Sequence, residues 1–149
     1  MNADDEINLK LIGRNHDDLK VISAYLQDSI VSVSDIAFLK QNRSFVMIVN
    51  RFMWENVERG IFGQNKRIRC AVKFEEVFKV KSQKINQKNK NKLLECLTIK
   101  CNSTFDEIYE TKIFFAGGSI ITIISEVIDV VMHDFGKPRN AKHVPIHKI

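Results

Sequence analysis

The chain has 149 residues, of which 44% are hydrophobic, and it carries a formal net charge of +5. This length predicts one domain whose core is large enough to be stable without a disulfide or a metal. The sequence has no run of about 20 consecutive apolar residues, which excludes a membrane-spanning helix. Residues 1–6 are acidic and no apolar run follows them, so we expect a disordered segment rather than a signal peptide.

The first elements expected along the chain are a short strand over residues 7–12 and then a helix. Asn15 is a good N-cap, and the two aspartates after it favour the positive end of a helix dipole. The helix should end near Asp28, where the apolar period changes. Its apolar residues recur at helical spacing on one face: Leu19, Ile22 and Leu26.

From Ser29 onward the apolar pattern is typical of strands. Residues 40–44 are expected to form a hairpin loop, and Gly117-Gly118 predicts a tight hairpin because primed turns need positive φ angles. Residues 127–135 fit either a strand or a helix, and their β-branched content favours the strand. The strand candidates before them are residues 30–33, 35–39, 45–49, 67–74, 78–81, 93–101, 109–115 and 119–124.

Together these elements predict an α+β fold with an N-terminal helix packed on a bent, mostly antiparallel sheet of about seven or eight strands. Such a sheet could close into a partial barrel. We expect a single domain over residues 7–136. Residues 137–149 are basic and show no periodicity, so they are expected to form a flexible tail.

The chain has three cysteines, Cys70, Cys96 and Cys101. An odd count without a secretion signal indicates free thiols in a reducing compartment, so we expect a cytoplasmic protein. Cys70 alternates with apolar residues and should point inward. Cys96 and Cys101 are five residues apart on one strand and should face opposite sides, which argues against a shared metal.

Three segments carry a resemblance to a known family: residues 18–28, Asn50-Arg51-Phe52-Met53-Trp54-Glu55 (the most specific segment) and Phe114-Phe115-Ala116-Gly117-Gly118. With them, nearly the whole chain, from about Leu9 to about Gly136, resembles a family of small bacterial proteins known as domain of unknown function twenty-nine forty-eight. The family's usual acidic residue before the tryptophan is replaced here by Met53. The resemblance implies a bacterial cytoplasmic protein of one domain and supplies no activity or catalytic residue.

A candidate ligand-binding site follows the most apolar strand directly and comprises Asn50, Arg51, Trp54 and Glu55. Polar residues at strand ends often line sites. Arg51 could hold a carboxylate or phosphate through its planar guanidinium, and Trp54 could stack on a ring. The structural alternative is that Trp54 covers the edge of the core while Arg51 pairs with Glu55 or a neighbour.

A candidate nucleic-acid-binding face is formed by basic residues that alternate with apolar ones: Arg67, Arg69, Lys73, Lys79 and Lys81. RNA-binding sheets usually add exposed aromatic side chains. Phe74 and Phe78 alternate with the basic residues and are expected to point inward with the other apolar side chains. This weakens the RNA interpretation. An outward row of basic side chains also protects a sheet edge from pairing with another chain.

The sequence offers no catalytic motif, metal set or cofactor signature, so an enzyme is not favoured. His143 and His147 have zinc-compatible spacing, but Pro145 between them argues against a helix. Our first hypothesis is a non-enzymatic binding or assembly module whose partner is a second copy or another protein. The alternatives are a nucleic-acid-associated protein and, less favoured, a small-ligand binder or enzyme. No membrane partner is expected.

Overall fold

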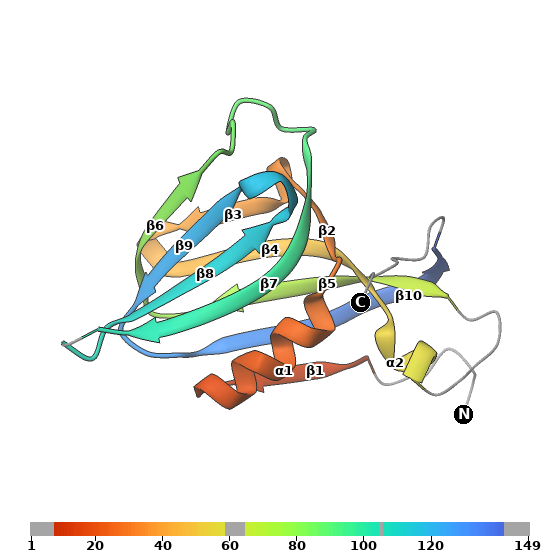
Figure 1. The fold of residues 1–149 in the computed structure, drawn as a ribbon, viewed down its shortest axis with the longest axis horizontal. Coiled ribbons are helices and arrows are strands. Elements are labelled where there is room, and N and C mark those ends of the chain that lie inside the picture. Colours follow the sequence, from red (N-terminus) through yellow and green to blue (C-terminus); the bar gives the residue numbers. More distant parts are fainter. Residues whose placement is uncertain (1–7, 59–64, 105, 142–149) are drawn as a thin grey trace.

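A computed structural model of the chain describes residues 8–58, 65–104 and 106–141. These residues form a single large bent sheet with two α-helices (Figure 1). The elements are β1 (Lys10–Gly13), α1 (His16–Leu26), β2 (Ile30–Ser32), β3 (Ile36–Leu39), β4 (Ser44–Phe52), α2 (Trp54–Glu58), β5 (Lys66–Phe74), β6 (Val77–Gln83), β7 (Leu93–Ser103), β8 (Tyr109–Phe115), β9 (Ile120–Ser125) and β10 (Val130–Asn140).

The strands of the sheet pair in the order β1-β10-β5-β4-β2-β7-β8-β9-β6, and β3 pairs with β4 beside this path. All the described pairings are antiparallel, as expected. The predicted count of seven or eight strands is too low, because all ten segments with a strand pattern form strands of the sheet, including the short β2 and β3. The sheet bends strongly but stays open, with β1 and β6 as the ends of the path (Figure 1).

Helix α1 begins where the sequence indicates, because the Asn15 side chain accepts a hydrogen bond from the Asp18 N–H at 2.8 Å. It follows β1, in the predicted order of a strand and then a helix, so the description of the fold as having an N-terminal helix is wrong. Its buried residues are Leu19, Ile22 and Leu26, as predicted. Neither described helix is long and apolar enough to cross a membrane.

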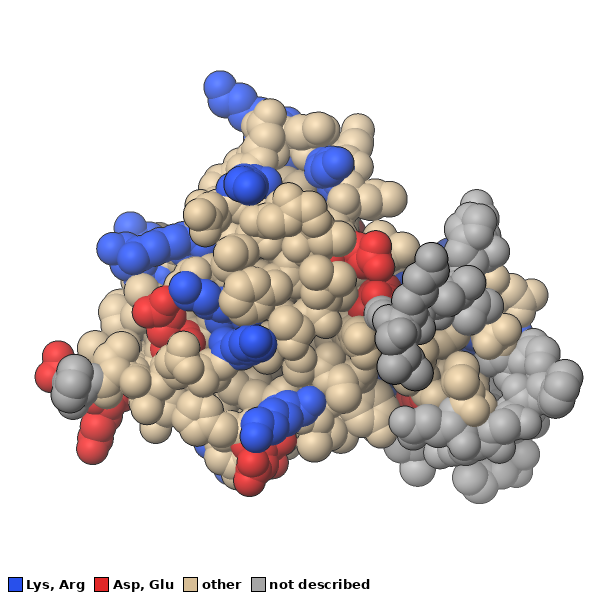
Figure 2. Space-filling model, in the orientation of Figure 1, with Lys and Arg blue, Asp and Glu red and all other residues tan. Residues whose placement is uncertain are grey.

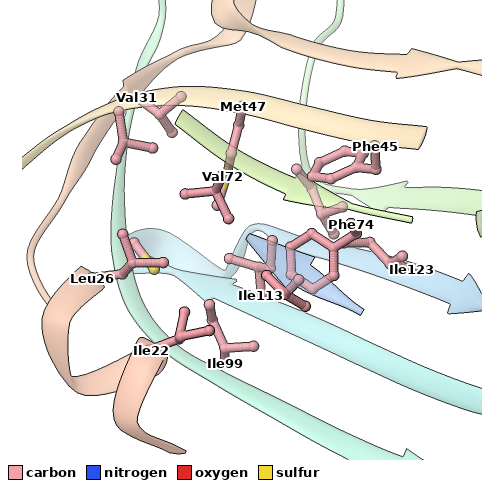
Figure 3. Packing of buried hydrophobic residues seen from close by; sticks show 14 of the residues in the cluster. Ile22, Leu26, Val31, Phe45, Met47, Val72, Phe74, Ile99, Ile113 and Ile123 are labelled. Atoms are coloured by element: carbon pink, nitrogen blue, oxygen red, sulfur yellow. The ribbon is translucent and has the colours of Figure 1, made fainter. Parts of the chain in front are cut away.

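The core lies on the concave side of the sheet, where α1 covers it. Ile22 and Leu26 of α1 point toward side chains of the sheet such as Val72 and Ile113 (Figure 3). Strand β4 pairs with β5 along its length and with β3 and β2 on its other side, so it is the central strand that its apolar sequence predicts. Strand β5 alternates buried and less buried residues, which confirms the period read from its sequence.

The C-terminal third of the chain tests the predicted glycine turn, the ambiguous segment 127–135 and the predicted tail. Gly117 and Gly118 connect β8 to β9 and have φ angles of 83° and 87°, which confirms a turn that needs glycine. The 127–135 segment is a strand from Val130 onward. Strand β10 continues to Asn140, so the predicted tail starts four residues too early. After a register shift that follows Phe135, the end of β10 pairs again with β5, Arg139 with Arg67 and Asn140 with Lys66. The predicted disordered residues 1–6 lie outside the described residues.

Candidate functional site

Two of the four residues predicted to bind a ligand, Arg51 and Glu55, meet where β4 leaves the core, around a buried guanidinium. Arg51 is fully buried. Its Nε and Nη2 donate to the two carboxylate oxygens of Asp134 on β10, at 2.8 and 2.6 Å. Its Nη1 and Nη2 donate to the carboxylate of Glu55 on α2, at 3.0 and 2.7 Å. Arg51 therefore ties β4, β10 and the short helix α2 together.

The guanidinium of Arg51 has no donor left for a ligand. Arginine has five N–H donors. Four bind the two carboxylates, and Nη1 also donates to the Phe52 carbonyl at 3.4 Å. Burial by itself lowers the pKa of Arg51, but the hydrogen bonds to Asp134 and Glu55 outweigh it, so the pKa is raised. A ligand carboxylate or phosphate would have to displace Asp134 or Glu55, and the ligand-binding role of these residues stays a prediction.

The other two residues of the predicted site are also engaged within the protein. The Trp54 indole N–H donates to the Gln27 carbonyl at 2.9 Å, and its ring packs edge-on against Phe52 with 4.7 Å between centroids. Asn50 is exposed, and its main-chain carbonyl accepts a hydrogen bond from Arg67. The geometry of this cluster matches the structural alternative, in which Arg51 pairs with Glu55.

The five predicted nucleic-acid-binding residues are divided between two strands that do not pair. On β5, the Nη1 atom of Arg67 donates hydrogen bonds to the main-chain carbonyls of Asp28 and Asn50, at 3.1 and 3.0 Å. Arg69 lies over the ring of Phe135 at 5.5 Å. Lys73 pairs with Glu75 at 2.9 Å, and this contact is the main reason why the pKa of Glu75 is lowered.

The remaining two, Lys79 and Lys81, are exposed on β6, which pairs with β9 instead. A register shift after Val77 turns Phe78 outward to 42% exposure, contrary to its predicted inward position. Figure 2 shows basic side chains scattered over one face of the molecule with acidic ones among them. The geometry therefore does not assemble the five basic residues into one continuous face, and their role stays a prediction.

A different feature, a groove beside β7, has the geometry of a binding site. On one side β7 pairs with β8 up to Ser103. On its other side β2 pairs only with Leu93–Glu95. Beyond that point no strand covers this edge of β7 among the residues that the structure describes. Helix α1 lies beside the uncovered edge (Figure 1).

The backbone of β7 shows which groups face the groove. The Ile99 N–H donates to the Ser23 hydroxyl on α1 at 2.9 Å, so it points away from β8. Because backbone groups of a strand alternate in direction, the N–H and C=O groups of Cys101 and Ser103 point the same way. The Thr104 N–H donates instead to the Ile108 carbonyl at 2.7 Å, in agreement with this alternation. The edge thus presents a row of main-chain donors and acceptors.

The groove encloses about 590 Å³ between α1 and β7. On the β7 side every residue from Leu97 to Asn102 lines it, as expected for a groove that follows a strand edge rather than one face. On the α1 side the residues that line it recur on one flank of the helix: His16, Leu19, Lys20, Ser23, Ala24 and Gln27. Among the described residues, the charged ones in the lining are Lys20 and Lys100, and no carboxylate lines the groove.

Sequence reasoning missed this groove. The flank of α1 shows only a polar stripe, which is common on solvated helices. The one local signal is Leu97, an apolar residue that a register shift between Cys96 and Thr98 leaves 42% exposed. The groove exists because β2 is short and α1 packs beside β7, and neither fact is encoded near residue 97.

Cys101 lines the groove and provides a direct probe of it. Burial raises the pKa of all three thiols, and Cys70 and Cys96 are fully buried whereas Cys101 is half-buried. A raised pKa keeps a thiol protonated and unreactive until the pH approaches that pKa. We expect Ellman's reagent at pH 8 to modify Cys101 first in the folded protein, and Cys70 and Cys96 only after unfolding. Cys101→Ser should remove the first phase, and modification of all three thiols at one rate would contradict the burial described.

No group of three or more potential metal ligands occurs among the described residues. The two histidines with zinc-compatible spacing, His143 and His147, lie outside the described residues.

Comparison with known proteins supports the family assignment and leaves the groove without a functional precedent. No curated protein and no solved structure matches the chain significantly. A family model described as "Protein of unknown function (DUF2948)" matches residues 9–147. Because this match covers almost the whole chain, the protein belongs to the DUF2948 family, as its sequence resemblance indicates.

Proposed function

We propose that this protein is a non-enzymatic binding module that accepts an extended segment of a partner protein as an added strand on β7. The observation that carries the proposal is the uncovered edge of β7 beside α1. Extended peptides bind other proteins by adding a strand to such an edge, where main-chain hydrogen bonds supply affinity and side-chain pockets supply specificity.

The dimensions of the groove fit a short peptide. The lining residues 97–102 of β7 span roughly 20 Å, at about 3.3 Å per residue of strand. A partner segment of about six residues would cover this length. Its main chain would pair with Cys101, which lines the groove, and with Ser103 just beyond the lining, because the backbone groups of both point away from β8. Ser23 already satisfies the N–H of Ile99.

The charges of the groove favour an acidic partner segment. Lys20 on α1 and Lys100 on β7 line the groove, and no carboxylate of the described part of the chain does. Complementary charges at the rim of an interface guide association and select partners more than they add affinity. Binding should therefore weaken as salt rises, because exposed charges are screened.

The test is a selection of 12-residue peptides from a random displayed library on the immobilised full chain. Selected peptides are then titrated against two helix variants by fluorescence polarisation. Ala24→Trp fills the groove from its α1 side, whereas Val21→Trp places the same side chain on an exposed position of α1 outside the lining. We expect Ala24→Trp to weaken binding about tenfold or more, because each lost main-chain hydrogen bond is worth about 1 kcal/mol. Val21→Trp should bind as the parent chain does.

Amide exchange and thiol labelling locate the bound peptide. A strand added to β7 should slow exchange of the Cys101 and Ser103 amides and protect the Cys101 thiol. Peptides that bind both tryptophan variants equally, or that leave these two amides unprotected, would refute the added strand.

A further inference from the structure

A second cavity, distinct from the groove beside β7, lies where the bent sheet fails to close. Within the described residues, β6 pairs with β9 alone and β3 with β4 alone. The Val77 N–H donates to the Arg43 carbonyl at 2.8 Å and holds the start of β6 against the β3–β4 turn. Beyond that bond no ladder joins β6 to β3 or β4 in the described parts of the chain.

The cavity in this opening encloses about 270 Å³ and its walls are apolar. Its inner walls belong to the buried core, and its outer walls are half-buried apolar residues of β3, β6 and the loop after β6. The inner walls are Val33, Phe45 and Ile121, and the outer walls are Ile36, Phe38, Val80 and Ile85. Apolar side chains thus line a path from the surface to the core.

Polar residues line only the mouth of the cavity. They are Ser82, Gln87 and Lys90, all of them exposed. The Gln87 amide donates to the Ser82 hydroxyl at 3.1 Å. The backbone of Lys90 is fixed there, because its carbonyl accepts from the Ser34 N–H at 3.0 Å and the Ser32 hydroxyl at 2.8 Å. Of the residues that the structure describes, no carboxylate lines this cavity, and Lys90 is the one charged residue in its lining.

An apolar cavity with a few polar groups at its mouth is the usual form of a small-molecule site. We propose that this cavity binds a single-chain amphiphile, with its hydrocarbon chain between β3 and β6 and its anionic head group at Lys90. A cavity of about 150 Å³ holds benzene, so this one holds roughly ten non-hydrogen atoms. That size suits one medium-length chain and excludes the two chains of a membrane phospholipid.

Sodium salts of six-, eight- and ten-carbon fatty acids test the site on the full chain, below their micelle concentrations. Methyl resonances of Ile36, Ile85 and Ile121 report binding by NMR. We expect saturable shifts at these methyls. The affinity should rise about fourfold for each added methylene, the ratio that corresponds to a gain in binding free energy of about 0.8 kcal/mol per buried CH₂ group. Shifts confined to the groove beside β7, or absent, would overturn the site.

Two lysines of the same loop give a matched pair of variants for the charge of the ligand. Lys90 lines the mouth and Lys88 does not, although both are exposed. Lys90→Ala should weaken decanoate binding severalfold and Lys88→Ala should not. Decyltrimethylammonium has a chain of the same length with a cationic head, and equal binding of the two ligands would overturn the anionic class.

A filling variant tests whether the chain enters the cavity. Ser82→Phe changes an exposed residue at the mouth, so the fold should survive, as circular dichroism would verify. It should abolish the shifts at Ile121, which belongs to the buried core. Decanoate that still shifts Ile121 in this folded variant would overturn the proposed path. This site does not depend on the peptide groove, since Ser82→Phe should leave peptide binding unchanged.

Discussion

Arg51→Ala is expected to lower the free energy of unfolding by about 3–5 kcal/mol, the usual cost of removing one partner from a buried ion pair. The variant leaves Asp134 buried, and it leaves Glu55 largely buried, without the guanidinium that neutralises them. Two carboxylates would then face each other in a site of low polarity. Urea unfolding followed by Trp54 fluorescence measures the change.

The matched control is an arginine whose ion pair is exposed. Arg43 pairs with Glu126 and Glu76, and these three side chains are 43–56% exposed. Exposed ion pairs contribute little to stability because water and salt screen them, so Arg43→Ala should change the free energy of unfolding little. A loss below about 1 kcal/mol for Arg51→Ala would contradict the structural role described for the cluster.

A combined replacement separates the charge of the cluster from its packing. Arg51→Met, Glu55→Leu and Asp134→Leu together remove all three charges and keep apolar volume. Apolar replacement of a complete buried ion network is often neutral or stabilising. We therefore expect the triple variant to be clearly more stable than Arg51→Ala alone, and an equally unstable triple variant would show that the cluster acts through shape rather than charge.

Leu26→Ala is expected to cost about 2–5 kcal/mol, as deletions of fully buried leucines do. Leu26 is 0% exposed on the last turn of α1, where it packs into the concave side of the sheet (Figure 3). Its removal leaves a cavity under the helix that forms one wall of the groove. Urea unfolding gives the loss of stability, and faster labelling of Cys101 would show that α1 has loosened from β7.

Val21→Ala on the same helix is the control, because Val21 is 49% exposed. Alanine has a higher helix propensity than valine, so stability should stay within about 0.5 kcal/mol of the parent or rise slightly. Equal losses for Val21→Ala and Leu26→Ala would mean that α1 is not anchored by its buried face.

Local pattern in the sequence determined much of the secondary structure. The N-cap at Asn15 and the spacing of Leu19, Ile22 and Leu26 located α1, because a helix repeats every 3.6 residues. Alternation over residues 67–74 located β5, and Gly117-Gly118 located the turn between β8 and β9. These signals are encoded within a few residues of one another, so they can be read without knowledge of the fold.

The partners of the polar residues were decided only by the tertiary structure. Glu55 is four residues from Arg51, and its pairing was one of the predicted alternatives. Asp134 is 83 residues away, and only the β10-β5-β4 order brings it to Arg51. The same holds for the uncovered edge of β7 and the opening between β3 and β6. Strand order results from contacts between distant segments, whose pairing leaves no local period in the sequence, and both proposed binding sites depend on that order.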